Sequence, residues 1–302
     1  MKKLHVKNLT IIAALLAVYI VWGSTYLGIK IAIETFPPLL MAAFRFFVAG
    51  VLMYGFVIVK EKQHPRLIEW KDATIVGTFL LLGGNGLVVI AEQTIPTSIA
   101  AIVIATVPLW MIVIAWFSKT HIKPTKSTII GTLLGFFGVI ILMFPSNQST
   151  FAFDIPGLLL TLLAAILWSF GSLYSQKALL PSSVMLSTAM QMIAGSAVLV
   201  CVATLLGEWH QLNLETLSLR SLSAFAYLIF FGSLVGFTAY VWLLKNASAY
   251  LASTYAFVNP VVALFLGYFF ADEIINSRVI VATVLIVSAV ILITASKARK
   301  KV

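Results

Sequence analysis

Long apolar stretches, separated by short polar gaps, run through the whole chain. Within each stretch the apolar residues are continuous and do not alternate with polar ones, which indicates helices rather than the strands of a membrane barrel. A helix needs about 20 mostly apolar residues to cross a bilayer. The pattern therefore predicts ten transmembrane helices, at residues 9–31, 37–59, 73–91, 97–117, 127–144, 156–176, 184–206, 221–243, 250–270 and 278–296. The gaps leave no room for a separate soluble domain, and the predicted fold class is an all-α integral membrane protein.

The composition supports this class. Of the 302 residues, 61% are hydrophobic and 10% are charged, and the mean hydropathy is +1.05. Soluble domains carry about 25% charged residues, so a water-soluble globular protein is excluded. The single cysteine, Cys201, excludes a disulfide within the chain, and the four histidines lie far apart in predicted loops. Because these ligands are few and dispersed, the sequence predicts no metal site. The GxxxxGK[ST] motif that binds ATP is also absent, so no cofactor is expected.

Lys and Arg residues give the chain a formal net charge of +10 and are distributed unevenly among the gaps. Sixteen of the twenty lie in alternate gaps, around residues 2–7, 60–71, 119–126, 177, 245 and 297–301. A nucleic-acid-binding protein would gather its cations on one solvated face, so no nucleic-acid partner is expected. Because positively charged loops remain in the cytoplasm, the pattern predicts a multi-pass protein of the cell (inner or plasma) membrane with both termini cytoplasmic.

The two halves of the chain resemble each other. Trp22 corresponds to Trp168 at an offset of 146 residues, and the same offset places Arg45 opposite Gln191. Five helices are an odd number, so the second half must enter the membrane from the opposite side. The prediction is thus two inverted five-helix repeats, 1–145 and 155–302, the second with a basic cytoplasmic tail, joined by a linker at 146–154. Inverted repeats are common in secondary transporters, whose substrate site lies near the midplane between the repeats.

Several motifs together resemble a known family. They are WGSTYLGIK (22–30), RFFVAG (45–50), GNGLVVIAEQ (84–93), ATVPLW (105–110), NPVVAL (259–264) and ADE (271–273). In order and spacing they resemble the drug/metabolite transporter superfamily, with two EamA-type domains and most similarity to its YedA-type members of bacterial inner membranes. The resemblance implies a central cavity bounded mainly by helices 1, 3, 4, 6, 8 and 9, with helices 5 and 10 at the periphery.

Arg45 is the charged residue that lies well inside a predicted span. Charged groups inside a membrane are costly and usually face a cavity or a partner. Two interpretations remain open: Arg45 either snorkels outward or ties helices together through Glu34 or Glu92, or it faces the cavity and binds a substrate carboxylate or phosphate through two hydrogen bonds. Asn85, among the glycines of residues 83–86, either joins a close helix pair or lines the cavity.

Acidic residues are absent from the interior of the predicted spans, since all ten lie in loops or at helix ends. A proton relay usually places a carboxylate or a histidine at membrane depth. The sequence therefore predicts no proton relay within the spans, and leaves an acid at a helix end, such as Glu92 or Glu34, as the group that could serve instead.

Pro108 and Pro260 lack the amide hydrogen and displace the carbonyl groups four residues earlier. They either bend the helices for packing or act as hinges; both interpretations stay open. Deep aromatic residues of both halves could form a pocket for an amphipathic substrate. The predicted substrate cavity consists of Trp22, Thr25, Tyr26, Arg45, Asn85, Glu92, Trp168, Gln191, Tyr240, Tyr255 and Asn259.

The leading functional prediction is a secondary transporter that exports small amphipathic metabolites, such as amino-acid-like compounds, or drugs across the cytoplasmic membrane by alternating access. Export rather than uptake is implied by the resemblance alone. Its partners would be the lipid bilayer and a small-molecule substrate, and a homodimer is left open. The alternative is a non-transporting membrane scaffold or a passive facilitator. No catalytic cluster lies at membrane depth, so an enzyme is not expected.

Overall fold

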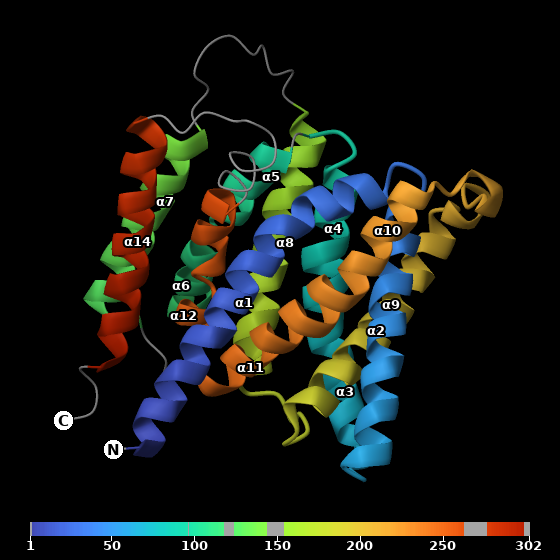
Figure 1. The fold of residues 1–302 in the computed structure, drawn as a ribbon, viewed down its shortest axis with the longest axis horizontal. Coiled ribbons are helices and arrows are strands. Elements are labelled where there is room, and N and C mark those ends of the chain that lie inside the picture. The colour runs from blue at the N-terminus through green and yellow to red at the C-terminus, as the bar shows by residue number, and fades with distance from the viewer. Residues whose placement is uncertain (1, 96, 118–123, 144–153, 263–276, 299–302) are drawn as a thin grey trace.

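The computed structural model describes residues 2–95, 97–117, 124–143, 154–262 and 277–298, and every regular element within these ranges is a helix (Figure 1). Six helical stretches are long and apolar enough to cross a membrane: Asn8–Ala32, Pro38–Lys60, Leu67–Ala91, Ile155–Ser175, Val184–Leu205 and Leu219–Asn246. They correspond to the predicted spans 1, 2, 3, 6, 7 and 8. The prediction of an all-α membrane protein is confirmed.

Within the described residues, the apolar helical stretches of the remaining predicted spans are shorter. Spans 5 and 10 are α7 (Lys126–Met143) and α14 (Ser277–Ala298), with apolar parts at Lys126–Ile141 and Ile280–Ile293. Span 4 is two helices, α5 (Thr97–Ile104) and α6 (Val107–Phe117), and span 9 begins with α12 (Ala249–Ala252) and is described as far as residue 262. The count of ten spans stays a prediction, and the predicted linker lies outside the described residues apart from Asp154.

The first two spans and spans 6 and 7 are single helices: α1 (Lys2–Ala32), α2 (Pro38–Lys60), α8 (Ile155–Ser175) and α9 (Val184–Leu205). Their ends follow ordinary capping rules. Ser183 accepts a hydrogen bond from the backbone N–H of Leu186 at the start of α9, at 3.3 Å. Pro38 is the first residue of α2. A backbone N–H at this position has no acceptor within the helix, so proline removes no hydrogen bond there.

Spans 3 and 8 each contain a π-helical segment in the middle. Span 3 consists of α3 (Leu67–Gly77), η1 (Thr78–Gly86) and α4 (Leu87–Ala91), and span 8 of α10 (Leu219–Tyr227), η4 (Leu228–Phe237) and α11 (Thr238–Asn246). π-Helical turns are rare and often lie at functional sites. Their occurrence at corresponding places in the two halves supports the repeat.

Spans 4 and 9 are each interrupted by a short turn. In the first half, the turn at Ala105–Thr106 separates α5 from α6, and the buried Val107 carbonyl accepts a hydrogen bond from the Ser169 hydroxyl at 3.0 Å. In the second half, the corresponding turn at 253–254 separates α12 from helical residues 255–262. Pro108 lies two residues beyond its break, whereas Pro260 lies six residues beyond its own. Both spans are therefore discontinuous, and a hinge role for either proline stays a prediction.

The two halves pack against each other along several helices (Figure 1). α2 lies along α9, α7 lies along α14, and α1 crosses α10 and η4. Glycines allow the close approach: a Cβ at Gly131 would lie 2.8 Å from the Ile293 side chain, and one at Gly138 would lie 2.8 Å from Ile286. At the start of α2, the carboxylate of Glu208 accepts the backbone N–H groups of Leu39 and Leu40, at 3.1 and 2.9 Å.

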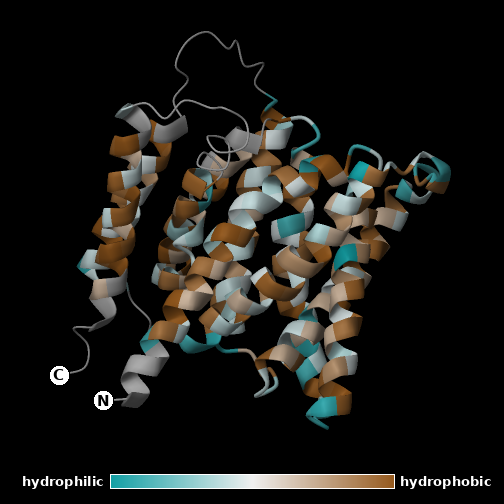
Figure 2. Ribbon diagram, in the orientation of Figure 1, coloured by the Kyte–Doolittle hydropathy of each residue, from teal (hydrophilic) through white to brown (hydrophobic). Residues whose placement is uncertain are grey.

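Large apolar side chains cover much of the outer surface, among them Leu16, Phe56, Phe137 and Val284. In Figure 2 hydrophobic residues dominate the middle of the helices, and hydrophilic residues gather toward their ends. An exposed apolar surface of this extent suits a lipid environment. We call the end of the bundle where α1 begins and where α2 and α14 end the terminal end, and the opposite end the far end (Figure 1).

Candidate functional site: a cavity between the two halves

A cavity lies where the two halves meet, and its atom-free space, together with its open mouth, measures about 680 Å³. Both halves line it, with Trp22, Thr25, Tyr26, Ile29, Arg45, Phe46, Leu81, Gly84, Asn85, Val88, Ile104, Val107, Ala164, Trp168, Gly232, Phe237, Tyr255 and Asn259. These residues belong to spans 1, 3, 4, 6, 8 and 9, as expected, and also to α2, from which only Arg45 was predicted to reach the cavity. Among the described residues, neither α7 nor α14 contributes a lining residue.

The tryptophans of the repeat, Trp22 and Trp168, meet at the centre, with ring centroids 5.5 Å apart and planes at 78°. Each comes from the first helix of one half and fills a glycine notch in the π-helical segment of the other half. A Cβ at Gly84 of η1 would lie 2.3 Å from the Trp168 ring, and one at Gly236 of η4 would lie 2.5 Å from the Trp22 indole nitrogen. That nitrogen also donates a hydrogen bond to the Gly232 carbonyl at 3.2 Å. The glycines thus allow a reciprocal exchange of aromatic side chains between the halves.

A hydrogen-bonded layer closes the cavity toward the terminal end. Tyr240 of α11 is fully buried, and its hydroxyl accepts the Trp168 indole N–H at 2.9 Å and lies 2.6 Å from the Ser172 hydroxyl. Close by, the hydroxyls of Tyr19 and Thr254 are 2.5 Å apart and join the two halves. Tyr240 therefore lies beneath the cavity, with its ring 5.0 Å from Trp22 between centroids, and does not line it.

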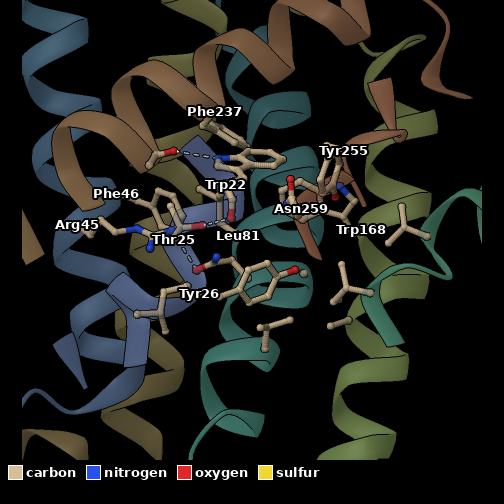
Figure 3. A pocket seen from close by; sticks show the side chains of 18 residues that line it. Trp22, Thr25, Tyr26, Arg45, Phe46, Leu81, Trp168, Phe237, Tyr255 and Asn259 are labelled. Carbon is tan, nitrogen blue, oxygen red and sulfur yellow. Dashed lines mark hydrogen bonds between the residues drawn. The ribbon is translucent and has the colours of Figure 1, made fainter. Parts of the chain in front are cut away.

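Arg45 lies about 10 Å along α2 from Pro38 at 1.5 Å per residue, and its side chain is 4% exposed. One Nη2 hydrogen bond reaches the Asn85 side-chain oxygen at 3.3 Å, whereas Nε and Nη1 have no acceptor among the described residues. Among the described residues Arg45 makes no ion pair within 4 Å, and Glu34 pairs with Arg220 instead, at 3.5 Å. Figure 3 shows Arg45 entering the cavity from one side, with Trp168 and Tyr255 on the other. The guanidinium thus has free donors where a ligand would sit.

The two asparagines of the cavity have different partners. Asn85 accepts from Arg45 and lies among glycines that pack on α8, so it both joins a close helix pair and lines the cavity. The Asn259 amide group, oriented to satisfy its neighbours, donates to the carbonyl oxygens of Tyr255 and Tyr19, at 3.0 and 3.3 Å. Asn259 therefore ties span 9 to α1 just beyond the break in that span.

Glu92 follows α4 directly and lies outside the Leu67–Ala91 span. It is 6% exposed, it does not line the cavity, and no described residue donates a hydrogen bond to either carboxylate oxygen. Burial raises the pKa of its carboxyl to about 8, against the positive charges of Lys30 and Arg45, which lower it. Glu92 is thus a buried acid close to the cavity cation.

Eight of the eleven residues predicted for the cavity line it. Glu92 and Tyr240 lie beside and beneath it. Gln191 lies outside: it is buried on α9, its amide donates to the Ser187 hydroxyl at 3.0 Å, and its backbone carbonyl meets Gly77 of α3. The role of each predicted residue in substrate binding stays a prediction. The apolar lining residues, such as Phe46 and Phe237, were missed because an apolar residue facing a cavity and one facing lipid look alike in sequence.

The model of the EamA-like transporter family matches residues 8–144 and 155–295, once for each half. The chain belongs to the EamA-like transporter family. As an EamA-like protein it is a membrane transporter, and this membership favours transport over catalysis. Among the described residues no group of three or more His, Cys, Asp or Glu side chains is placed to hold a metal.

Relatives of this EamA-like chain match along nearly its full length. It is 39% identical to the inner membrane transporter YedA of Escherichia coli K12 over 96% of this chain and 92% of that protein. It is 24% identical to the transporter YoaV of Bacillus subtilis over 97% and 99% of the two chains. A solved structure, titled only as the crystal structure of a protein, shares the fold with a TM-score of 0.75 at 18% identity, over 96% of this chain and 97% of that one. The resemblance seen in the sequence motifs is confirmed.

Proposed function

We propose that this protein is a secondary transporter of the cell membrane that exports small amphipathic metabolites bearing a carboxylate, amino-acid-like compounds among them, or drugs of similar chemistry. The observation that carries the proposal is the division of the cavity into a polar and an aromatic side. On one side Arg45 has N–H donors without an acceptor among the described residues, and on the other Trp22, Trp168 and Tyr255 pack edge to face. A planar carboxylate fits the guanidinium, and an apolar body fits the aromatic rings.

Transport would proceed by alternating access of the two inverted repeats about this cavity. The layer around Tyr240 and the Tyr19–Thr254 contact close the terminal side. Positive charge in the gaps predicts that the terminal end faces the cytoplasm. The structure then corresponds to a state closed toward the cytoplasm, and export requires this layer to separate so that the substrate can enter. The likeness to YedA, an inner membrane transporter, supports the membrane assignment.

The experiment compares three probes that share one aromatic body. Phenylacetate carries a carboxylate, phenethylamine carries an ammonium group, and phenylalanine carries both. Binding to the detergent-purified protein is followed by calorimetry and flux by radiolabelled probe in proteoliposomes, with and without a pH gradient. We expect phenylacetate and phenylalanine to bind and cross the membrane, and phenethylamine to bind at least tenfold more weakly, because one charge-assisted hydrogen bond contributes about 1.5–3 kcal/mol.

Arg45→Gln separates the proposed contact from general apolar binding. The variant is expected to bind phenylacetate no better than wild type binds phenethylamine. Equal binding of all three probes by wild type, or full phenylacetate flux through Arg45→Gln, contradicts the proposal. Binding of phenylacetate without any flux supports the non-transporting scaffold alternative.

A further inference from the structure

Glu92 is a buried acid that the proposed transport mechanism has not used. Its backbone N–H bonds to the Val88 carbonyl at 2.9 Å, so the residue caps the C-terminal end of α4. The side chain is 6% exposed, and both of its oxygens lack a donor within the part of the chain that the structure describes. An ionised carboxylate is poorly stabilised there, because it has neither water nor hydrogen bonds and sits at the negative end of a helix dipole.

Positive charges nearby act in the opposite direction. Arg45 on α2 and Lys30 on α1 both favour the ionised form of Glu92, and they are the opposite charges that act on its pKa, which burial raises to about 8. Burial is thus the stronger influence, the charges of Lys30 and Arg45 offset part of it, and the protonation of Glu92 depends in part on how much of the Arg45 charge it experiences.

The other titratable groups around Glu92 are few. α1 also presents Tyr26, whose hydroxyl is electrostatically coupled to Glu92. η1 and the described part of α5 carry none, and the half of α8 nearest Glu92 has only Asp154 at its N-cap, which accepts hydrogen bonds from its own neighbours. Arg45 and Lys30 therefore determine the charge balance, and Lys30 is exposed to solvent.

We propose that Glu92 is a proton-binding site whose occupancy is linked to an anion on Arg45. An anion at the Nε and Nη1 donors neutralises the guanidinium, which otherwise favours the ionised form of Glu92. A proton from water then forms an O–H bond on one carboxylate oxygen, and the carboxyl becomes neutral. This inference rests on the proposed anion site at Arg45.

Linkage requires the effect to be reciprocal: if the anion promotes protonation of Glu92, protonation of Glu92 tightens anion binding by the same factor. Anion and proton are then bound in the same state of the protein. A monovalent carboxylate carried together with a proton moves no net charge, so its transport would depend on the pH gradient and be indifferent to the membrane potential, and export would be driven by the gradient of the substrate itself.

The test measures proton uptake by the full-length protein when phenylacetate binds, using calorimetry in buffers of different ionisation enthalpy at about pH 8. Wild type is expected to take up a substantial fraction of one proton for each bound anion, and its affinity to fall by up to about tenfold for each pH unit above that value. Glu92→Gln is expected to bind phenylacetate with no proton uptake and an affinity independent of pH.

Glu34→Gln is the matched control, because it removes a carboxylate at the far end that is exposed and paired with Arg220; it should behave like wild type. Proton uptake that persists in Glu92→Gln overturns the inference. If that variant does not fold, infrared difference spectra of wild type decide instead, since phenylacetate must then increase the absorption of a protonated carboxyl. Binding through Arg45 without proton uptake overturns this inference alone, whereas binding unaffected by Arg45→Gln overturns the proposed function as well.

Discussion

At the residue scale, the guanidinium of Arg45 has one hydrogen bond, to Asn85, and no ion pair among the described residues. Insertion of an arginine at the centre of a membrane helix costs about 2.5–3.5 kcal/mol, and less nearer the interface. Natural sequences keep such a group where something in the folded state or its ligand offsets this cost. The free donors and the position on the cavity wall favour the ligand as that partner.

The first prediction separates a ligand contact from a structural role. Arg45→Lys and Arg45→Gln should both insert and keep a melting temperature close to that of wild type, while flux of phenylacetate per folded molecule falls about tenfold or more. Lysine keeps the charge but cannot form two parallel hydrogen bonds. Melting in detergent and proteoliposome flux are measured on the same preparations. A stable Arg45→Gln protein with unchanged flux would rule out the contact.

The second prediction uses the stability of the protein rather than its transport. Burial raises the pKa of Glu92 to about 8, whereas an unfolded glutamate titrates near about 4.3. The folded state therefore binds more protons in between, and the stability contributed by the neutral carboxyl is lost as the pH rises from about 5 through 8. Glu92→Gln should flatten this part of the wild-type melting profile. An identical slope in wild type and variant would contradict the raised pKa.

At the element scale, the π-helical segments η1 and η4 provide the notches that accept Trp168 and Trp22. Both notches depend on the absence of a side chain at a single position. Because the tryptophans come from opposite halves, these contacts position the repeats relative to each other and at the same time form the cavity floor.

The third prediction tests the notches by adding one methyl group. Gly84→Ala and Gly236→Ala would place a Cβ 2.3 Å from the Trp168 ring and 2.5 Å from the Trp22 indole nitrogen. Overpacking of this kind costs about 1–3 kcal/mol, so both variants should melt at lower temperature. Gly55→Ala in α2 is the control, because nothing lies within 4 Å of its new Cβ; it should be neutral or slightly stabilising. Equal melting of all three variants would contradict the notch geometry.

The fourth prediction concerns which helices line the cavity. In a protein whose Cys201 is replaced by serine, cysteines at Asn85 and Asn259 should react with a small water-soluble thiol reagent, and phenylacetate should protect them. Cysteines at Phe136 of α7 and Val287 of α14 should stay unmodified, because a thiol facing lipid does not ionise. Labelling yields by mass spectrometry would reject the arrangement if the pattern were reversed.

Some of these features could be predicted from sequence patterns, and others could not. Trp22 and Trp168 are predictable because a tryptophan recurs at a fixed offset, and Arg45 because a charge in an apolar span is conspicuous. Gln191 shows the limit: it matches Arg45 by offset, yet its short side chain bonds to Ser187 within α9. The π-helical segments leave no sequence signature, since an apolar helix keeps its composition when its hydrogen bonds shift by one residue.

At the scale of the whole molecule, the halves interlock through α2 with α9, α7 with α14, and α1 with η4. The long apolar helices were predictable from hydropathy, whereas the pairing between halves was not, because helices surrounded by lipid have few polar residues to distinguish one partner from another. The break in span 4 was foreshadowed by Pro108. That in span 9 lies at Ser253–Thr254, six residues away from Pro260, and was not.

The fifth prediction is the topology. Fusions to a fluorescent protein that matures only in the cytoplasm, and to an alkaline phosphatase active only outside it, are made at three places. Both termini should fluoresce, and an insertion in the linker at 146–154 should show phosphatase activity, because an odd number of spans separates them. Phosphatase activity at either terminus would exclude the orientation predicted from the positive charges.

The pairing of α7 with α14 has a consequence for how the protein is made. The glycine face of α7 meets Ile286 and Ile293, which belong to the last helix of the chain. During synthesis the first repeat therefore enters the membrane with this face uncovered, and the face stays uncovered until α14 has also been inserted. A chain truncated before Ser277 would expose a surface built for close helix contact, which membrane proteases and promiscuous helix partners can both engage. The glycine face of α7 is thus covered only after α14 has been inserted.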